Sequence, residues 1–150
     1  MTNKYFYIFI AWACILVQTQ TSFAQIKTYT FEQIDSLQRT EKRNIVIFIH
    51  TDWCKYCHLM KNTTFKNETV LKLLNDKFYF IDLHAEEKRN IVFNQHTFKY
   101  KPTGTNTGTH ELADQLGNFE NKLSYPTLCI LNADNEIIFQ YPLYINAIDL

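Results

Sequence analysis

One stretch, Asn44 to Met60 (NIVIFIHTDWCKYCHLM), constrains the fold of this chain more than any other. It opens with β-branched and aromatic residues, Ile45 to Ile49, which predict a strand buried on both faces. After a short turn, Cys54-Lys55-Tyr56-Cys57 stands where a helix can begin. Unpaired backbone N–H groups and the positive end of the helix dipole stabilise a thiolate there, and two intervening residues bring both sulfurs within disulfide range. The stretch therefore predicts the active site of a thiol–disulfide oxidoreductase.

The composition is that of one globular domain. The chain has 150 residues, of which 46% are hydrophobic and 15% aromatic, enough for a single domain with its own core. Its formal net charge is zero, which indicates neither a nucleic-acid surface nor a polyanionic partner. We expect a monomer that binds no nucleic acid.

The first 24 residues are typical of a targeting segment. Lys4 supplies a positive charge, and the apolar run Tyr5 to Val17 is shorter than the roughly 20 residues of a membrane span. Ser22-Phe23-Ala24 then offers the small residues that a signal peptidase reads. We expect cleavage after Ala24, which divides the chain into a signal peptide, 1–24, and a mature domain, 25–150.

Two alternatives stay open for this segment. It is retained as a membrane anchor, or it is lipidated at Cys14, which follows Ala13, although Trp12 fits a lipobox poorly. In every case we expect the domain to be exported, to the periplasm or another extracytoplasmic compartment. Disulfides form and persist in such compartments.

Cysteine usage agrees with redox chemistry rather than with a disulfide scaffold. Of the four cysteines, Cys14 leaves with the signal peptide, so the mature chain keeps Cys54, Cys57 and Cys129. Three cysteines cannot build several bridges. Because Cys129 lies in the apolar run Leu128 to Leu131, we predict a buried small hydrophobe rather than a third redox thiol.

The mature chain alternates helices and strands. Its first half predicts a helix from the capping box Thr30/Gln33 to about Arg39–Arg43, the strand Ile45–Ile49, the active-site helix, a helix from Lys66-Asn67-Glu68 to about Asn75–Lys77, and the strand Phe78–Leu83. Its second half predicts a helix within His84–Gln95, a loop at Phe98–Gly108, a helix at Thr109–Leu116 stopped by Gly117, and a β-hairpin of Pro126–Leu131 with Ile137–Tyr141.

This order predicts an α/β fold. Strands that alternate with helices pair in parallel, and the terminal hairpin adds antiparallel strands, so we expect a central mixed β-sheet flanked by helices on both faces. Few residues follow Pro142, which predicts a short last helix or a truncated one.

The motifs resemble those of the thioredoxin-like superfamily. The segments TDWCKYCHLM, NETVLKLLND, FYFIDL and SYPTLCILNADNEII occur in the family's order, and the likeness extends from about Thr30 to Tyr141. The motifs resemble most closely those of exported bacterial thioredoxin-fold proteins with a TDWCxxC motif. W-C-x-x-C after a strand, or Y-P-T before a strand, is weak evidence for the family by itself. The two motifs together, in this order, are strong evidence. The resemblance implies the thioredoxin fold.

The resemblance also implies the roles of the site residues. Cys54, nearer the helix start and more exposed, would be the nucleophile, and Cys57, one turn deeper, would resolve the mixed disulfide. In the family the proline of Tyr125-Pro126-Thr127 has a cis peptide bond and lies against the disulfide, so that the backbone beside it pairs with an extended substrate. An ordinary trans proline at a strand start is the alternative.

The neighbours of the cysteines are expected to tune and cover the site. Lys55 adds a positive charge that favours the thiolate, and Asp52 opposes it. Trp53 would cover the sulfur and offer the substrate an apolar contact, while Tyr56 is a substrate contact or an exposed aromatic. The expected partners are protein thiols and disulfides, with a membrane electron-donor or acceptor protein as a further candidate; no cofactor is expected.

Three departures from thioredoxins stand out. Phe48 occupies the position of a buried carboxylate that helps to deprotonate the resolving cysteine, and the strand carries no acid. Lys-Tyr replaces Gly-Pro between the cysteines, so the resemblance does not imply a reduction potential. The segment Lys99 to Ser124 is long, and it shapes a substrate surface or is an idle insertion.

Other ligand chemistries have less support. C-K-Y-C-H, which ends in His58, matches a c-type haem attachment motif with Met60 or another histidine as second ligand, but the strand-Trp context and Y-P-T argue against it. Zinc held by Cys54, Cys57 and histidines is weakly supported because neither a second C-x-x-C nor a paired H-x-x-x-H occurs, and we expect no metal. The remaining histidines are scattered and predicted to be surface or core residues: His50, His84, His96 and His110.

Two function hypotheses follow. The first is an exported thiol–disulfide oxidoreductase that uses Cys54 and Cys57. The alternative is a non-catalytic thioredoxin-fold binding or chaperone-like module. The two differ in whether Cys54 is an exposed and acidic thiol.

Overall fold

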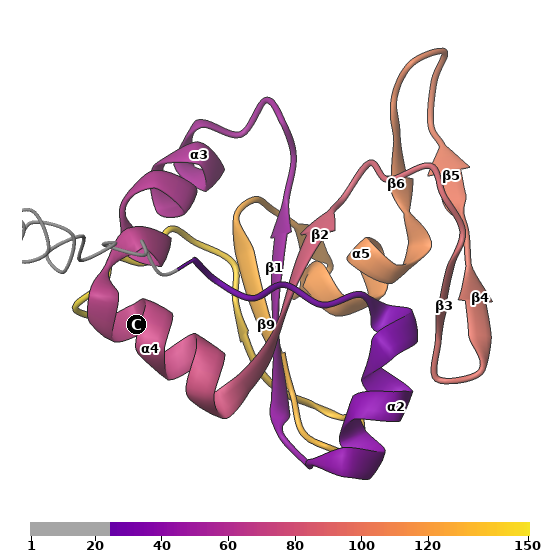
Figure 1. Ribbon diagram of the computed structural model, residues 1–150. Helices are drawn as coiled ribbons and strands as arrows, with labels where there is room; N and C mark the ends of the chain where they lie inside the picture. The colour runs from indigo at the N-terminus through magenta and orange to yellow at the C-terminus, as the bar shows by residue number, and fades with distance from the viewer. Residues whose placement is uncertain (1–24) are drawn as a thin grey trace, which may run out of the picture.

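The structure is a computed structural model that describes residues 25–150; the predicted signal peptide, its cleavage site and Cys14 lie outside the described residues. One mixed sheet stands between two layers of helices (Figure 1). The elements of the sheet and its helices are α2 (Phe31–Thr40), β1 (Asn44–His50), α3 (Lys55–Asn62), the 3-10 turn η1 (Thr64–Lys66), α4 (Glu68–Lys77), β2 (Phe78–His84), α5 (Glu111–Gly117), β9 (Thr127–Leu131) and β10 (Ile137–Tyr141). The short hairpin strands are β3 (Ile91–Phe93), β4 (His96–Phe98), β5 (Tyr100–Pro102), β6 (Gly108–His110), β7 (Asn118–Phe119) and β8 (Lys122–Leu123).

The main sheet has the order β10-β9-β1-β2. β1 and β2 are parallel, with Asn44 opposite Phe78 and His50 opposite His84, and they are connected through α3, η1 and α4. β9 runs antiparallel to both β1 and β10. The predicted mixed sheet with helices and a C-terminal hairpin is therefore confirmed. Among residues 25–150, no helix has the length and apolarity needed to cross a bilayer.

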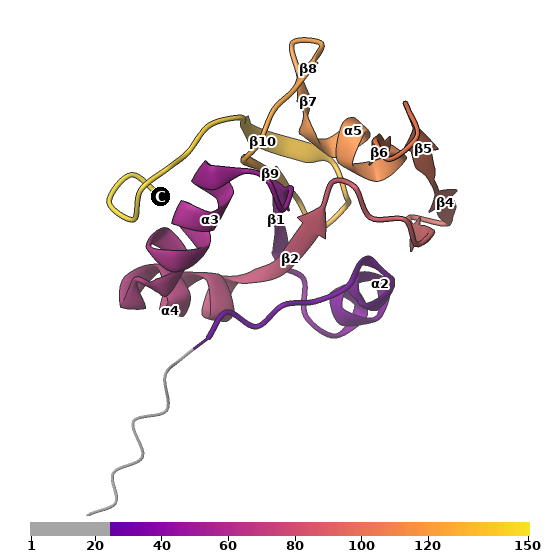
Figure 2. The same ribbon diagram turned by 90° about the horizontal axis from the view of Figure 1, so that it is seen from above.

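The alternation of side chains along β1 divides the core in two. Ile45, Ile47 and Ile49 are fully buried against the layer that contains α2 and α5. Val46 and Phe48 point the other way, into the cluster that also contains both cysteines of α3 and the apolar face of α4. Figure 2 shows the two helix pairs on opposite sides of the sheet. Burying each large side chain contributes about 1.5–3 kcal/mol, so β1 anchors both layers.

The helix starts of the first half follow the sequence signals. Gln33 Oε1 accepts a hydrogen bond from the Thr30 N–H at 2.9 Å, which is half of the predicted capping box of α2. Asn67 caps α4 by accepting from Thr69 N–H at 3.0 Å and Val70 N–H at 3.2 Å. A cap of this kind contributes about 1 kcal/mol to the stability of the helix start.

The prediction of a helix within His84–Gln95 is wrong. That segment instead ends in strand β3 and the turn of the β3–β4 hairpin, in which Ile91 pairs with Phe98. Its turn places Asn94 and Gln95 at φ values of 50° and 62°, which a right-handed helix excludes. The predicted loop at Phe98–Gly108 is likewise partly a hairpin, β5–β6.

The short helix expected at Thr109–Leu116 is α5, which begins at Glu111. Gly117 is its last residue, so the predicted end of this helix is confirmed, although no glycine in the described part of the chain has a positive φ. A Cβ at Gly117 would lie 2.7 Å from Leu123 Cδ1 and 3.0 Å from Ile49 Cδ1. The glycine is needed because α5 packs closely against the end of β1.

The predicted last helix is reduced to one turn. Leu150 N–H donates to Asn146 O at 3.2 Å, and the rest of the segment after β10 is irregular. Its apolar side chains pack on the core beneath α3, and Thr64 Oγ1 holds it by donating to Ile145 O at 2.8 Å.

Candidate active site

The two cysteines of the C-x-x-C motif form a disulfide across the first turn of α3, with their Cα atoms 5.2 Å apart. Cys54 is the N-cap residue of the helix, and its Sγ accepts a hydrogen bond from the Cys57 N–H at 3.1 Å. Cys54 is 5% exposed and Cys57 1%, so the first cysteine is the more accessible of two buried sulfurs. The backbone N–H of Cys57, in the first turn of the helix, thus meets the sulfur of Cys54, an environment that favours a thiolate.

Trp53 and Tyr125 bring the two sequence motifs together. Their rings form an edge-to-face pair with centroids 5.7 Å apart, and Trp53 Nε1 donates to Glu86 Oε1 at 3.1 Å. Trp53 remains 65% exposed, while burial raises the pKa of Tyr125. The Tyr125–Pro126 peptide bond is cis, as the resemblance implied. W-C-x-x-C and Y-P-T therefore contact each other on one surface.

Pro126 and Thr127 are both buried beside this aromatic pair. Thr127 Oγ1 donates to Ser124 O at 2.7 Å, and its backbone lies opposite Ile49 of β1. Because the hydroxyl is already used inside the protein, a substrate would meet this residue through its backbone. Its predicted role in substrate binding stays a prediction.

The two charged residues expected to tune Cys54 are exposed on either side of it. Lys55 is the first residue of α3. Asp52 directs its carboxylate to His84, with Oδ1 3.3 Å from Nε2, and its backbone carbonyl accepts from His58 Nε2 at 2.7 Å. Their effects on Cys54 stay predictions. Tyr56 is exposed and lies near the ring of Tyr144.

β1 has no acidic residue, but the neighbouring strand β2 carries a carboxylate. Phe48 is fully buried, and the residue opposite it on β2 is Asp82. Asp82 contacts His50 Nε2 at 2.6 Å and Lys61 Nζ at 2.9 Å. Burial raises the pKa of Asp82, but the hydrogen bonds and charges of His50 and Lys61 outweigh burial and hold it below its usual value. Lys61, which pairs with Asp82, follows Cys57 by one helical turn on α3 and therefore lies on the same side of that helix as Cys57.

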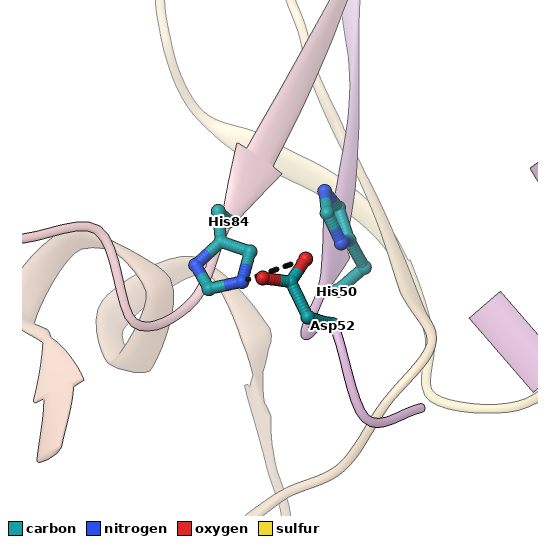
Figure 3. A group of neighbouring side chains, drawn as sticks. All are labelled: His50, Asp52 and His84. Atoms are coloured by element: carbon teal, nitrogen blue, oxygen red, sulfur yellow. Dashed lines mark ion pairs between the residues drawn. The ribbon is translucent and has the colours of Figure 1, made fainter. Parts of the chain in front are cut away.

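Two histidines that the sequence left scattered are neighbours in the fold. His50 and His84 are the last residues of β1 and β2 and lie opposite each other in the parallel register. With Asp52 they form a compact cluster in front of the strand ends (Figure 3). The available signal was that both predicted strands are followed by a histidine, but only the register aligns them. His110, by contrast, is buried and caps α5 by accepting from Leu112 N–H at 3.2 Å.

Comparison with known proteins places the chain in a family. Residues 30–150 match the model of a thioredoxin-like domain. The chain belongs to this family. A solved thioredoxin from Thermus thermophilus superposes with a TM-score of 0.57 at 16% identity, covering 83% of this chain and 80% of that one. DsbH oxidoreductase superposes with a TM-score of 0.54 at 14% identity, covering 84% and 79%. These likenesses establish the thioredoxin fold.

A curated relative matches only part of this thioredoxin-like chain. An uncharacterised protein of Caenorhabditis elegans is 32% identical over 59 residues, which cover 38% of this chain and 8% of that protein. The chain spans less than a tenth of the length of the curated relatives that it matches.

Proposed function

We propose that this protein is an exported thiol–disulfide oxidoreductase that acts on protein disulfides, with Cys54 as nucleophile and Cys57 as resolving cysteine. The observation that carries the proposal is the Cys54–Cys57 disulfide at the start of α3, with Cys54 at the N-cap. A pair in this position can cycle between dithiol and disulfide while the rest of the helix stays in place. The thioredoxin fold of the chain supports the proposal.

The reaction proceeds through a mixed disulfide. In the reducing direction the Cys54 thiolate attacks one sulfur of a substrate disulfide, forms a Cys54–substrate bond and releases the other substrate sulfur as a thiolate. The Cys57 thiolate then attacks Cys54 Sγ, which closes the internal disulfide and releases the second substrate thiolate. Two electrons pass from the enzyme to the substrate, and the reverse sequence oxidises a client dithiol.

Substrate binding is assigned to the surface around the aromatic pair. Trp53 is largely exposed beside Cys54, and its ring contacts the ring of Tyr125 from the Y-P-T motif. The backbone next to Pro126 would pair with an extended client segment, so that a client disulfide is presented to Cys54. Trp53 would supply apolar contact that does not depend on the client's sequence.

The redox proposal is tested by the reduction potential of the Cys54–Cys57 pair, measured by equilibration with glutathione and thiol trapping. A reversible two-electron couple is expected. A potential near −270 mV, about the thioredoxin level, would identify a reductant, and one between about −180 and −120 mV an oxidant or isomerase. A pair without a reversible couple would overturn the enzyme proposal in favour of a binding module.

Client proteins provide the second test. Cys57→Ala should accumulate mixed disulfides with clients, because the resolving sulfur is missing and the Cys54–client bond persists. The matched control is Cys54→Ser/Cys57→Ala, which has no nucleophile and should trap nothing. Equal capture by both variants would show that binding does not involve Cys54.

Export is supported by the targeting pattern of the first 24 residues. Expression of the full chain, followed by mass spectrometry of the purified protein, should give a mature N-terminus at Gln25. A mass that includes residues 1–24 would contradict cleavage and favour a retained anchor, which membrane fractionation would then reveal.

A further inference from the structure

We propose that His50, Asp52 and His84 form a binding site for a divalent transition-metal cation such as zinc. The three side chains come from the carboxyl ends of the parallel strands β1 and β2 and from the segment that leads to α3. The site uses neither cysteine, so it goes beyond the proposed redox function. It also differs from the zinc site through the cysteines that the sequence made improbable.

The ligand atoms are already gathered. A ring nitrogen of each histidine and a carboxylate oxygen of Asp52 all lie within 4.8 Å of one another. Figure 3 shows the carboxylate of Asp52 between the two imidazole rings. Zinc bonds of about 2.0–2.1 Å in a tetrahedron place neighbouring ligand atoms about 3.3 Å apart. The distance from His84 Nε2 to Asp52 Oδ1 is 3.3 Å, so this edge of the tetrahedron needs no rearrangement.

His50 is held in the form that a metal requires. Asp82 Oδ1 lies 2.6 Å from His50 Nε2, and a carboxylate at that distance accepts the ring proton. The lone pair of the neutral ring is then on Nδ1, which becomes the ligand atom. A carboxylate that fixes the far nitrogen of a ligating histidine is the usual support of such a site. The Lys61 ammonium also lies near Nε2, at 3.0 Å, but it pairs with Asp82 Oδ2 at 2.9 Å, which offsets its charge.

His84 provides an independent indication. Its Nε2 is shielded from solvent and makes no hydrogen bond, despite its contact with Asp52. A shielded ring nitrogen without a hydrogen-bond partner requires a reason, and a bound ion supplies one. Glu86 N–H donates to His84 Nδ1 at 3.2 Å. Binding a metal through Nε2 moves the ring proton to Nδ1, so this long hydrogen bond is exchanged for a coordination bond.

The donor set points to a class of metal. Two imidazoles and one carboxylate suit zinc, copper or nickel better than magnesium or calcium, which prefer oxygen ligands. Three protein ligands also leave the fourth position for water, as in catalytic rather than structural zinc sites. The Asp52 side chain is 87% exposed, so the site is open to an ion from solvent. A bound ion would tie both strand ends to the segment immediately before Cys54.

The test is a calorimetric titration of the oxidised wild-type protein with zinc. The disulfide keeps Cys54 and Cys57 out of coordination, and the remaining thiol of the described chain, Cys129, is buried. We expect saturable binding of one ion per chain. His84→Gln and Asp52→Asn should each weaken that binding by at least about 10-fold, and Asp82→Asn by about 10-fold, because it removes the support of His50.

His96→Gln is the matched control, because His96 is an exposed histidine on β4, outside the cluster. It should bind zinc with the affinity of the wild type, and circular dichroism should show that every variant is folded. No saturable binding by the oxidised protein, or binding that survives His84→Gln, would overturn the proposal. Since the disulfide stays closed throughout, the result does not depend on whether the protein proves to be an oxidoreductase.

Discussion

The start of α3 and the middle of β9 both contain buried cysteines, yet they are different chemical environments. Cys54 and Cys57 are 5% and 1% exposed, and Cys129 is fully buried between β1 and β10. Burial therefore does not distinguish them. Cys129 is surrounded by the apolar interior, and burial raises its pKa to about 12. Cys54 instead lies at a helix start, where the backbone N–H of Cys57 faces its sulfur.

The difference shows that reactivity depends on what faces a sulfur more than on its exposure. An anion at the helix start gains hydrogen bonds and the helix dipole, while an anion in the middle of β9 would lose its hydration and gain nothing. We therefore assign redox chemistry to one region and packing to the other.

Replacing Cys54 should abolish most of the activity, whereas replacing Cys129 should leave it almost unchanged. Cys54→Ser should lower the rate of insulin disulfide reduction by at least about 1000-fold, because the hydroxyl is a far weaker nucleophile than the thiolate. Cys129→Ala should retain the rate within about 2-fold. A strong loss of activity in folded Cys129→Ala would mean that Cys129 is a third redox thiol and that the two regions do not differ in function.

The reduced protein should show the contrast directly in its alkylation rates. With a pKa of about 12, Cys129 is ionised only to an order of 10⁻⁴ to 10⁻⁵ near pH 7.5, so iodoacetamide should modify Cys54 at least about 100-fold faster. Since Cys129 stays protonated, its labelling should remain slow up to pH 9. Peptide mass spectrometry across this pH range measures both rates, and fast labelling of Cys129 in the native protein would contradict its assignment.

The packing role of Cys129 should be visible in stability. Cys129→Ser places a hydroxyl in the apolar interior, and we expect a loss of about 1–3 kcal/mol in the free energy of unfolding. Urea denaturation of the oxidised protein measures it, with Cys129→Ala as the variant that loses volume without adding a polar group. A serine variant as stable as the wild type would mean that the β9 site accommodates polarity and that its effect on the thiol pKa is small.

The smallest effect concerns the charges around Cys54. Lys55→Gln removes a positive charge next to the thiolate, and an exposed charge at this range changes a pKa by a few tenths of a unit, roughly a 2-fold change in alkylation rate near neutral pH. Asp52→Asn should act in the opposite direction. The pH dependence of Cys54 labelling, measured at low salt, separates the two. Unchanged profiles in both variants would leave the helix start as the source of activation.

The part of the fold that could be predicted from sequence is the part governed by local signals. The buried run Ile45–Ile49, the helix start at Lys66-Asn67-Glu68 and the hairpin of Pro126–Leu131 with Ile137–Tyr141 are each indicated by residues close together in the sequence. The corresponding elements lie where the sequence predicts them. C-x-x-C at a helix start is equally local, and the disulfide confirms the pairing.

What could not be predicted depends on tertiary placement. Asn94 and Gln95 adopt positive φ values although neither is a glycine, so the local sequence does not indicate the β3–β4 turn. His50 and His84 are distant in sequence, and only the register of β1 with β2 sets them opposite each other. For the same reason the sequence of β1, which has no acidic residue, does not reveal that the paired strand carries Asp82 opposite Phe48.

The close contact at Gly117 has a consequence for genetic screens. Any side chain there must displace Ile49 or Leu123, and Ile49 lies in the strand that leads into the C-x-x-C segment. A mutant at this position would therefore present in a screen as a redox-deficient allele, although the residue lies 60 positions from Cys57, the nearer of the two C-x-x-C cysteines. Second-site suppressors should be substitutions of Ile49 or Leu123 by smaller residues, which make space for the new side chain without changing the cysteines.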